Sequence, residues 1–139
     1  MLTTSSNGVD WTSPRRIPTG GRGSTVTHLL PGLSVDGRNV AVAYYSATQP
    51  TGCNYTCDSS IEAWLSLSRT RGSTWLPPQR LTTETVRSNW LADTGLGRML
   101  GDYISSSWVG GKPVAILPLA SAPARGRFKE QIFAAGVSK

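Results

Sequence analysis

Glycine- and proline-containing turns divide this sequence into short segments, and their spacing constrains the fold more than any other feature. The 139 residues include 15 glycines and nine prolines, against only three Glu, three Lys and two Met. Between the turns, apolar and polar residues alternate with a period of two, which is typical of half-buried strands. This balance disfavours a helical bundle. We therefore predict an all-β fold.

Seven strands are predicted, near residues 25–33, 40–46, 61–68, 75–81, 103–109, 114–119 and 131–137. Turn pairs such as Asp36-Gly37 and Gly110-Gly111 separate them. Residues 40–45 and 114–117 are apolar enough to be buried on both faces of a sheet. A helix is compatible with residues 82–90 alone, and only weakly.

Length and charge exclude some classes of protein. A chain of 14.8 kDa has the size of one domain. No apolar run approaches the roughly 18 residues that a membrane span needs. The net charge is +6, but the eleven arginines are scattered and form no basic block, so nucleic acid is not an expected partner. Because the guanidinium group pairs well with carboxylates, an acidic ligand is at least as natural.

Cys53 and Cys57 flank the sequon Asn54-Tyr55-Thr56 within a polar loop. A local disulfide fits this arrangement, and it implies an oxidising compartment. Free thiols and a metal site are the alternatives, although a metal would need more ligands and the single histidine, His28, is distant in sequence. The N-terminus lacks a charged region followed by an apolar one, so it does not read as a secretory signal.

Two segments share a spacing of Gly and Trp. In residues 68–75, Ser68, Gly72, Thr74 and Trp75 occupy positions one, five, seven and eight. Residues 4–11 place a hydroxyl residue, Gly8 and Trp11 at matching offsets. The tryptophans are 75 − 11 = 64 residues apart, and a proline-containing polar stretch follows each of them.

This spacing resembles the Asp-box, or bacterial neuraminidase repeat (BNR repeat), with the pattern Ser-x-Asp-x-Gly-x-Thr-Trp. In sialidase-like β-propellers the box is a structural hairpin between the third and fourth strands of a blade. Glycine supplies the positive φ of the turn, the hydroxyls bond to its backbone, and Trp packs it onto the blade. Both copies depart from the pattern at the aspartate, where Ser6 and Thr70 stand, and the first has Asp10 in place of Thr.

The resemblance implies a partial β-propeller of about two four-stranded antiparallel blades. Residues 1–18 would end one blade, 24–82 would form a complete blade, and 101–137 would give three strands of the last. The final segment also resembles the C-terminal end of bacterial secreted sialidase-like proteins. Because a propeller needs at least four blades to close, the chain is expected to be a fragment that needs missing blades or a second copy.

Sialidases of this superfamily bind the substrate carboxylate with three arginines, use a tyrosine activated by Glu as nucleophile, and use Asp as acid/base. Asp102 and Tyr103 open the expected innermost strand of the last blade and are the catalytic candidates, with a Gly-Asp turn and a core tyrosine as the alternative. Arg98 is a candidate for binding an anion, or else a solvated loop residue. The arginine triad and the Tyr/Glu pair do not map residue by residue.

The remaining aromatic residues have structural alternatives. Trp90 lies in an irregular segment and is the best candidate for stacking on a sugar ring, whereas Trp64 and Trp108 fall within strands and are expected to pack between blades. Tyr44 and Tyr45 should point to opposite faces because neighbours in a strand alternate. His28 is expected to be structural. No zinc spacing, phosphate-binding glycine loop or Ser/His/Asp grouping is present, so neither a metal nor a cofactor is expected.

Two functions follow as hypotheses. The first is the C-terminal part of a secreted, extracellular sialidase-like glycoside hydrolase that acts on glycans, inactive as this fragment. The second is a non-catalytic propeller module that binds glycan or protein. A self-assembling half-propeller is a third, structural alternative.

Overall fold

The computed structural model describes residues 1–21, 23, 25–53 and 57–136, and apart from one 3-10 turn its regular secondary structure in these residues consists of antiparallel strands. The sequon at residues 54–56, Arg22, Ser24 and the end of the last predicted strand at Val137 lie outside the described residues. The all-β prediction is confirmed. No helix in the described residues has the length and apolar character needed to cross a membrane.

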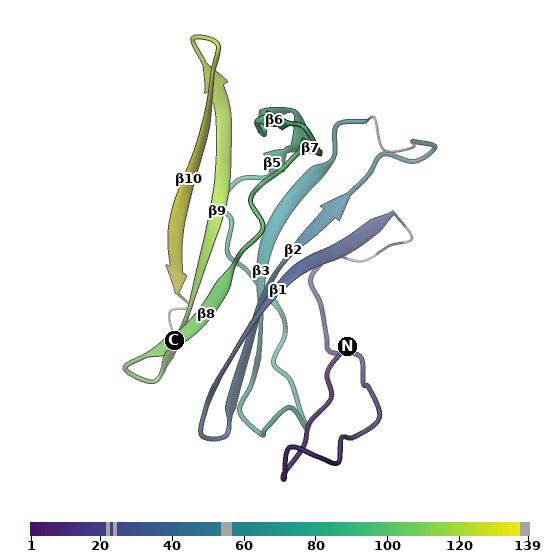
Figure 1. Cartoon of the computed structure of the whole chain (residues 1–139), viewed down its shortest axis with the longest axis vertical. Coiled ribbons are helices and arrows are strands. Elements are labelled where there is room, and N and C mark those ends of the chain that lie inside the picture. The colour runs from purple at the N-terminus through teal and green to yellow at the C-terminus, as the bar shows by residue number, and fades with distance from the viewer. Residues whose placement is uncertain (22, 24, 54–56, 137–139) are drawn as a thin grey trace.

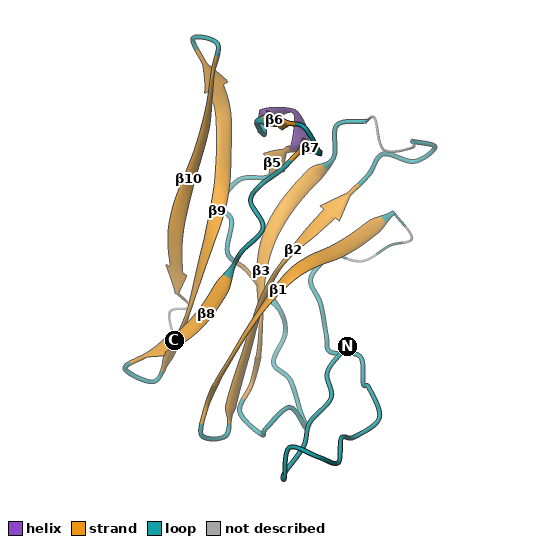
Figure 2. Cartoon of the chain, viewed as in Figure 1, coloured by secondary structure: helices purple, strands orange, loops and turns teal. Residues whose placement is uncertain are grey.

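The first sheet is a meander that follows the order of the chain (Figures 1 and 2). It contains β1 (Val26–Asp36), β2 (Asn39–Thr48), β3 (Ser60–Ser68) and β4 (Gln79–Arg80), and a short β5 (Val86–Arg87) also pairs with β3. The β1–β2 turn contains Gly37 at φ 59°, as Asp36-Gly37 predicts. Three of the predicted strands thus appear close to their expected bounds.

The second sheet is a three-stranded meander of β8 (Ser105–Val109), β9 (Lys112–Ala124) and β10 (Arg127–Gly136). A two-stranded hairpin, β6 (Asp93–Thr94) and β7 (Gly97–Arg98), lies in the segment that connects the two sheets. In Figure 1 the second sheet stands beside the first, with the β6–β7 hairpin near one end of the gap between their ribbons.

The fourth predicted strand and the possible helix are corrected. The strand expected over residues 75–81 shrinks to Gln79–Arg80, since Pro77 and Pro78 have no N–H to donate to a ladder. In residues 82–90, β5 is followed by a single 3-10 turn, η1 (Ser88–Trp90), and no longer helix forms.

The main core lies between the two sheets. Side chains of β2 and β3 meet those of β9, together with Val86, Leu91 and Leu100 from the connecting segment. Strand β1 of the first sheet approaches β8 of the second sheet closely where β1 has a bulge between Leu29 and Gly32. A Cβ on Gly32 would lie 3.0 Å from the Cα of Ser105, so a larger residue would require the backbone at the start of β8 to shift by a few tenths of an ångström.

A second, smaller core covers the opposite face of the first sheet. Val40, Val42 and Tyr44 of β2 pack with Ile17 and other residues of the N-terminal segment. The alternate residues Ala41, Ala43 and Tyr45 face the main core. Both predictions for this strand, burial on both faces and opposite directions for Tyr44 and Tyr45, are therefore confirmed.

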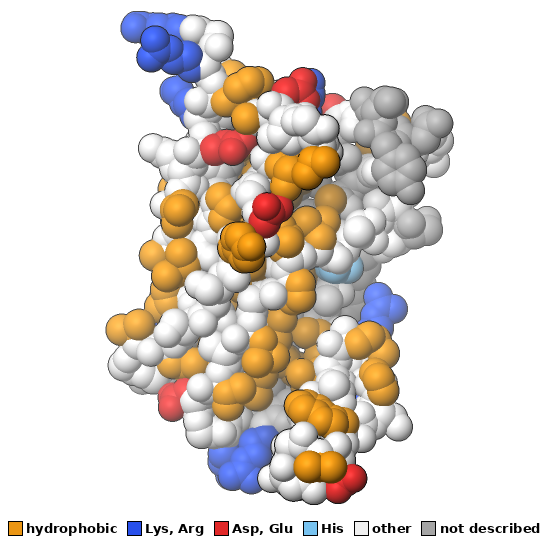
Figure 3. All heavy atoms as spheres, viewed as in Figure 1, with side chains coloured by type: hydrophobic (Ala, Val, Ile, Leu, Met, Phe, Trp, Pro, Cys, Tyr) orange, Lys and Arg blue, Asp and Glu red, His pale blue; other side chains and the backbone are white. Residues whose placement is uncertain are grey.

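The second sheet is covered on one face only. Ala115 and Leu117 are buried, whereas Ile116 between them is 42% exposed and Ile132 of β10 is 77% exposed. The prediction that residues 114–117 are buried on both faces is thus wrong, because the side chain of Ile116 remains exposed on the outer face. Figure 3 shows Lys and Arg side chains gathered at the tip of the β9–β10 hairpin.

Candidate functional site

The second Asp-box-like segment forms a hydrogen-bonded turn between β3 and β4. The buried hydroxyl of Ser68 accepts from the backbone N–H of Thr70 (3.2 Å) and of Gly72 (2.9 Å). The Thr70 hydroxyl, at the aspartate position, accepts from the Thr74 N–H at 2.8 Å. The Trp75 indole donates to the Gly72 carbonyl at 3.1 Å. A threonine hydroxyl thus accepts a backbone hydrogen bond at the position where the pattern has aspartate.

The first copy forms a different turn. Ser5, rather than Thr4, accepts from the N–H of Gly8 at 2.8 Å, and the Asn7 amide oxygen accepts from the next two N–H groups. The side chain of Trp11 is 61% exposed, so it does not pack its turn against the smaller core as Trp75 does for the second turn. The two segments therefore share their spacing but not their bonding.

The sequence candidates Arg98 and Asp102 border one hollow of about 400 Å³ at the end of the sheet–sheet interface. Its apolar wall includes Leu29 and Leu30 of the β1 bulge and Leu91 of the connecting segment. Leu30 has a φ of 51°, a left-handed conformation that costs a branched side chain free energy and therefore marks a constrained position.

Arg98 is the cation at this hollow. Its Nε lies 3.9 Å from Oδ1 of Asp93, with side-chain exposures of 45% and 77%. An ion pair this long and exposed contributes little. The guanidinium group thus keeps donors that could bind an anion.

Asp102 and Tyr103 lie in the loop before β8 rather than in the strand, which begins at Ser105. Tyr103 is 88% exposed, so the alternative of a core tyrosine is wrong. Both residues border a neighbouring hollow of about 410 Å³ together with Glu130 of β10. Glu130 accepts a hydrogen bond from the Ala92 N–H at 2.7 Å. Nothing in the local sequence around Glu130 indicates this proximity.

The other aromatic candidates have structural surroundings. Trp90 is half-buried against the main core and, with Phe133, borders a third hollow, so one part of its surface is used in packing. Trp108 packs against the main core and Trp64 against the smaller one, while their packing between blades stays a prediction. His28 is 2.8 Å from the Gly20 carbonyl and contacts the Tyr44 ring edge-on.

Asp58 directly precedes Ser59, which lines the 400 Å³ hollow. Burial opposes ionisation of this carboxylate, but the Asn89 N–H, the Arg87 guanidinium and the Ser88 hydroxyl outweigh it and hold the pKa of Asp58 below its usual range. Immediately before it, Cys57 forms the predicted disulfide with Cys53.

Comparison with known proteins adds no assignment to this geometry. No family model matches the chain, and no match was found among curated proteins or among solved structures.

Proposed function

We propose that this chain is a portion of a sialidase-like β-propeller that acts on glycans as a secreted glycoside hydrolase in its complete form. The turn from Ser68 to Trp75 supports the proposal, because it connects the third and fourth strands of a meander and is bonded by hydroxyls and closed by tryptophan. The face-to-face arrangement of two such meanders is compatible with adjacent blades.

The chemistry of the proposal rests on one observation: Asp102, Tyr103 and Glu130 border one hollow, and Asp102 also borders the hollow that contains Arg98. Glycoside hydrolysis commonly needs two carboxyl groups at the scissile bond. In this proposal Asp102 is the acid/base candidate, Tyr103 the nucleophile candidate and Arg98 a ligand for a substrate carboxylate. Other blades would supply the remaining groups, so the fragment alone is expected to be inactive.

Hydrolysis of a fluorogenic sialoside tests this function in a protein that carries enough blades to close the ring. We expect Asp102→Asn to lower kcat by at least about 100-fold, which is the usual contribution of a general acid. Asp36→Asn, at the exposed end of β1, is the matched control and should retain activity. Absence of turnover on sialosides and on other glycosides would eliminate the hydrolase proposal.

A non-catalytic propeller module that binds glycan or protein is the second candidate. The two tyrosines of β2 favour this candidate, because both hydroxyls make structural hydrogen bonds and neither is available as a nucleophile. The Tyr44 hydroxyl accepts from the Gly20 N–H at 2.7 Å, and the Tyr45 hydroxyl donates to the Pro118 carbonyl at 2.6 Å. Saturation-transfer NMR with sialyllactose would reveal binding. Binding without turnover in the ring-closed protein would support this candidate over the hydrolase.

A further inference from the structure

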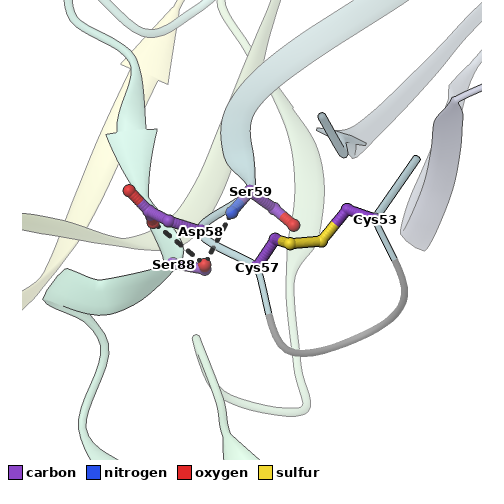
Figure 4. The surroundings of a disulfide bond; sticks show 5 residues. All are labelled: Cys53, Cys57, Asp58, Ser59 and Ser88. Carbon is purple, nitrogen blue, oxygen red and sulfur yellow. Dashed lines mark hydrogen bonds between the residues drawn. A yellow bond between two sulfur atoms is a disulfide. The ribbon is translucent and has the colours of Figure 1, made fainter. Parts of the chain in front are cut away.

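The disulfide lies next in sequence to a dense hydrogen-bond network. Figure 4 shows the Cys53–Cys57 bond, then Asp58 and Ser59 at the entrance to β3, facing Ser88 of η1. The Ser59 N–H donates to the Ser88 hydroxyl at 2.8 Å, and the Ser88 N–H donates to the Ser59 carbonyl at 2.9 Å. These two contacts join segments that are 29 residues apart in sequence.

Both oxygens of Asp58 bond to the same short segment. Oδ1 accepts from the Ser88 hydroxyl and the Asn89 N–H, each at 3.1 Å. Oδ2 accepts from Nε of Arg87 at 2.8 Å, and a second guanidinium nitrogen lies 2.7 Å away. The carboxylate therefore holds three consecutive residues, and charge-assisted bonds of this kind are stronger than neutral ones.

This attachment matters for the hollow because Ser59, Ser88 and Leu91 all line it. The ladder between β3 and β5 has only two residue pairs, Ser60 with Arg87 and Ile61 with Val86. So short a ladder gives little support to η1 by itself. Trp90 and Leu91 pack one side of this segment against the main core, and Asp58 with the backbone that presents it fixes the Ser88 side that lines the hollow.

We propose that the Cys53–Cys57 disulfide and Asp58 form a redox-sensitive clamp that positions the η1 wall of the hollow. Asp58 is a positioning residue here, acting through Ser88 and Asn89. A dithiol such as dithiothreitol would open the clamp. One of its thiolates attacks a cysteine sulfur and forms a mixed disulfide, then its second sulfur closes a cyclic disulfide and releases both cysteines as thiols. The dithiol loses two electrons, and the protein disulfide gains them.

The size of the effect is bounded by loop-closure entropy. Cys53 and Cys57 are four positions apart in sequence. Closing a ring this small reduces the number of conformations open to the unfolded segment, and so its population, by a factor of about 30 at most. Reduction should therefore accelerate hydrogen exchange at the amides of Ser59, Ser88 and Asn89 by up to about thirtyfold. The hollow is the one in our proposed function, but this measurement needs no ligand and is independent of glycosidase activity.

Hydrogen exchange of the intact chain with and without dithiothreitol tests the clamp. The Leu76 amide, bonded to the Leu67 carbonyl at the opposite end of β3, is the internal control and should be unchanged. Asp58→Asn should accelerate exchange at Ser88 and Asn89 in the oxidised protein, and reduction should then add little. The variant Cys53→Ser/Cys57→Ser should reproduce the reduced profile without a reductant.

Two results would overturn the proposal. Unchanged exchange at Ser59, Ser88 and Asn89 after verified reduction would show that the disulfide does not support the wall. Equal acceleration at these amides and at Leu76 would show that the disulfide stabilises the whole sheet rather than a local clamp.

Discussion

Replacing Tyr45 by phenylalanine tests how the two sheets are joined. Tyr45 of β2 is fully buried, and its hydroxyl donates to the carbonyl of Pro118 in β9 at 2.6 Å. The substitution keeps the ring but leaves that carbonyl without this donor. A buried group left unsatisfied costs about 1–3 kcal/mol, so at pH 7 we expect Tyr45→Phe to lower the free energy of unfolding by about 1–2 kcal/mol.

The same residue makes a pH-dependent prediction. Burial raises the pKa of Tyr45 well above its usual value, so the folded chain keeps the proton when the unfolded chain begins to lose it. Above pH 10 the unfolded state thus binds fewer protons, and stability falls by up to about 1.4 kcal/mol per pH unit. Phenylalanine has no proton to lose. The stability advantage of the native chain over Tyr45→Phe should therefore shrink by about 1.4 kcal/mol between pH 7 and pH 11.

Urea denaturation followed by tryptophan fluorescence at the two pH values measures both effects. Tyr103→Phe is the matched control, because Tyr103 is 88% exposed and its loss should change stability little at either pH. An equal difference between native chain and Tyr45→Phe at pH 7 and pH 11 would refute the reasoning about burial and ionisation.

Three further predictions concern other parts of the chain. Ser68→Ala should cost about 1–3 kcal/mol in urea denaturation, since it removes the acceptor of two backbone N–H groups, whereas Ser73→Ala, exposed in the same turn, should cost almost nothing. Ile132→Thr, on the uncovered face of the second sheet, should change stability by no more than about 0.5 kcal/mol and reduce concentration-dependent light scattering. Folding lowers the pKa of Asp58, so the stabilisation from its ionised form is complete above the unfolded pKa of about 3.8 and is lost as the pH falls through the folded pKa. Asp58→Asn should therefore lose less stability than the native chain in acid titrations.

Local pattern predicted the strands well because alternation and turn chemistry act over a few residues. The β1–β2 and β8–β9 hairpins follow from Asp36-Gly37 and Gly110-Gly111, although β9 continues to Ala124, beyond the end predicted at Leu119. The sequence also indicates the short β4, because Pro77 and Pro78 have no N–H to donate to a strand ladder.

The site was less predictable because it depends on which segments meet. Arg98 and Asp102 are close in sequence, and their shared hollow follows from that. Glu130 joins Asp102 and Tyr103 only through the position of β10 beside β9, and Ser59 meets Ser88 only through the pairing of β3 with β5. Alternation places a residue on a face of its strand, but it does not say which loop will cover that face.

The double-sided burial of β2 has a consequence for the order of folding. The pairings of β2 with β1 and β3 join neighbouring segments, whereas the contacts that join the two sheets, Tyr45 with Pro118 and Ser106 with Gly32, span 73 and 74 residues. Closing such long loops is slow compared with forming a hairpin. The β1–β3 meander should therefore form first, with the Tyr45 face of β2 exposed until the second sheet packs against it. During synthesis, the second sheet begins only at Ser105, well after β3 ends at Ser68, so the Tyr45 face of β2 should stay exposed longer than the Tyr44 face.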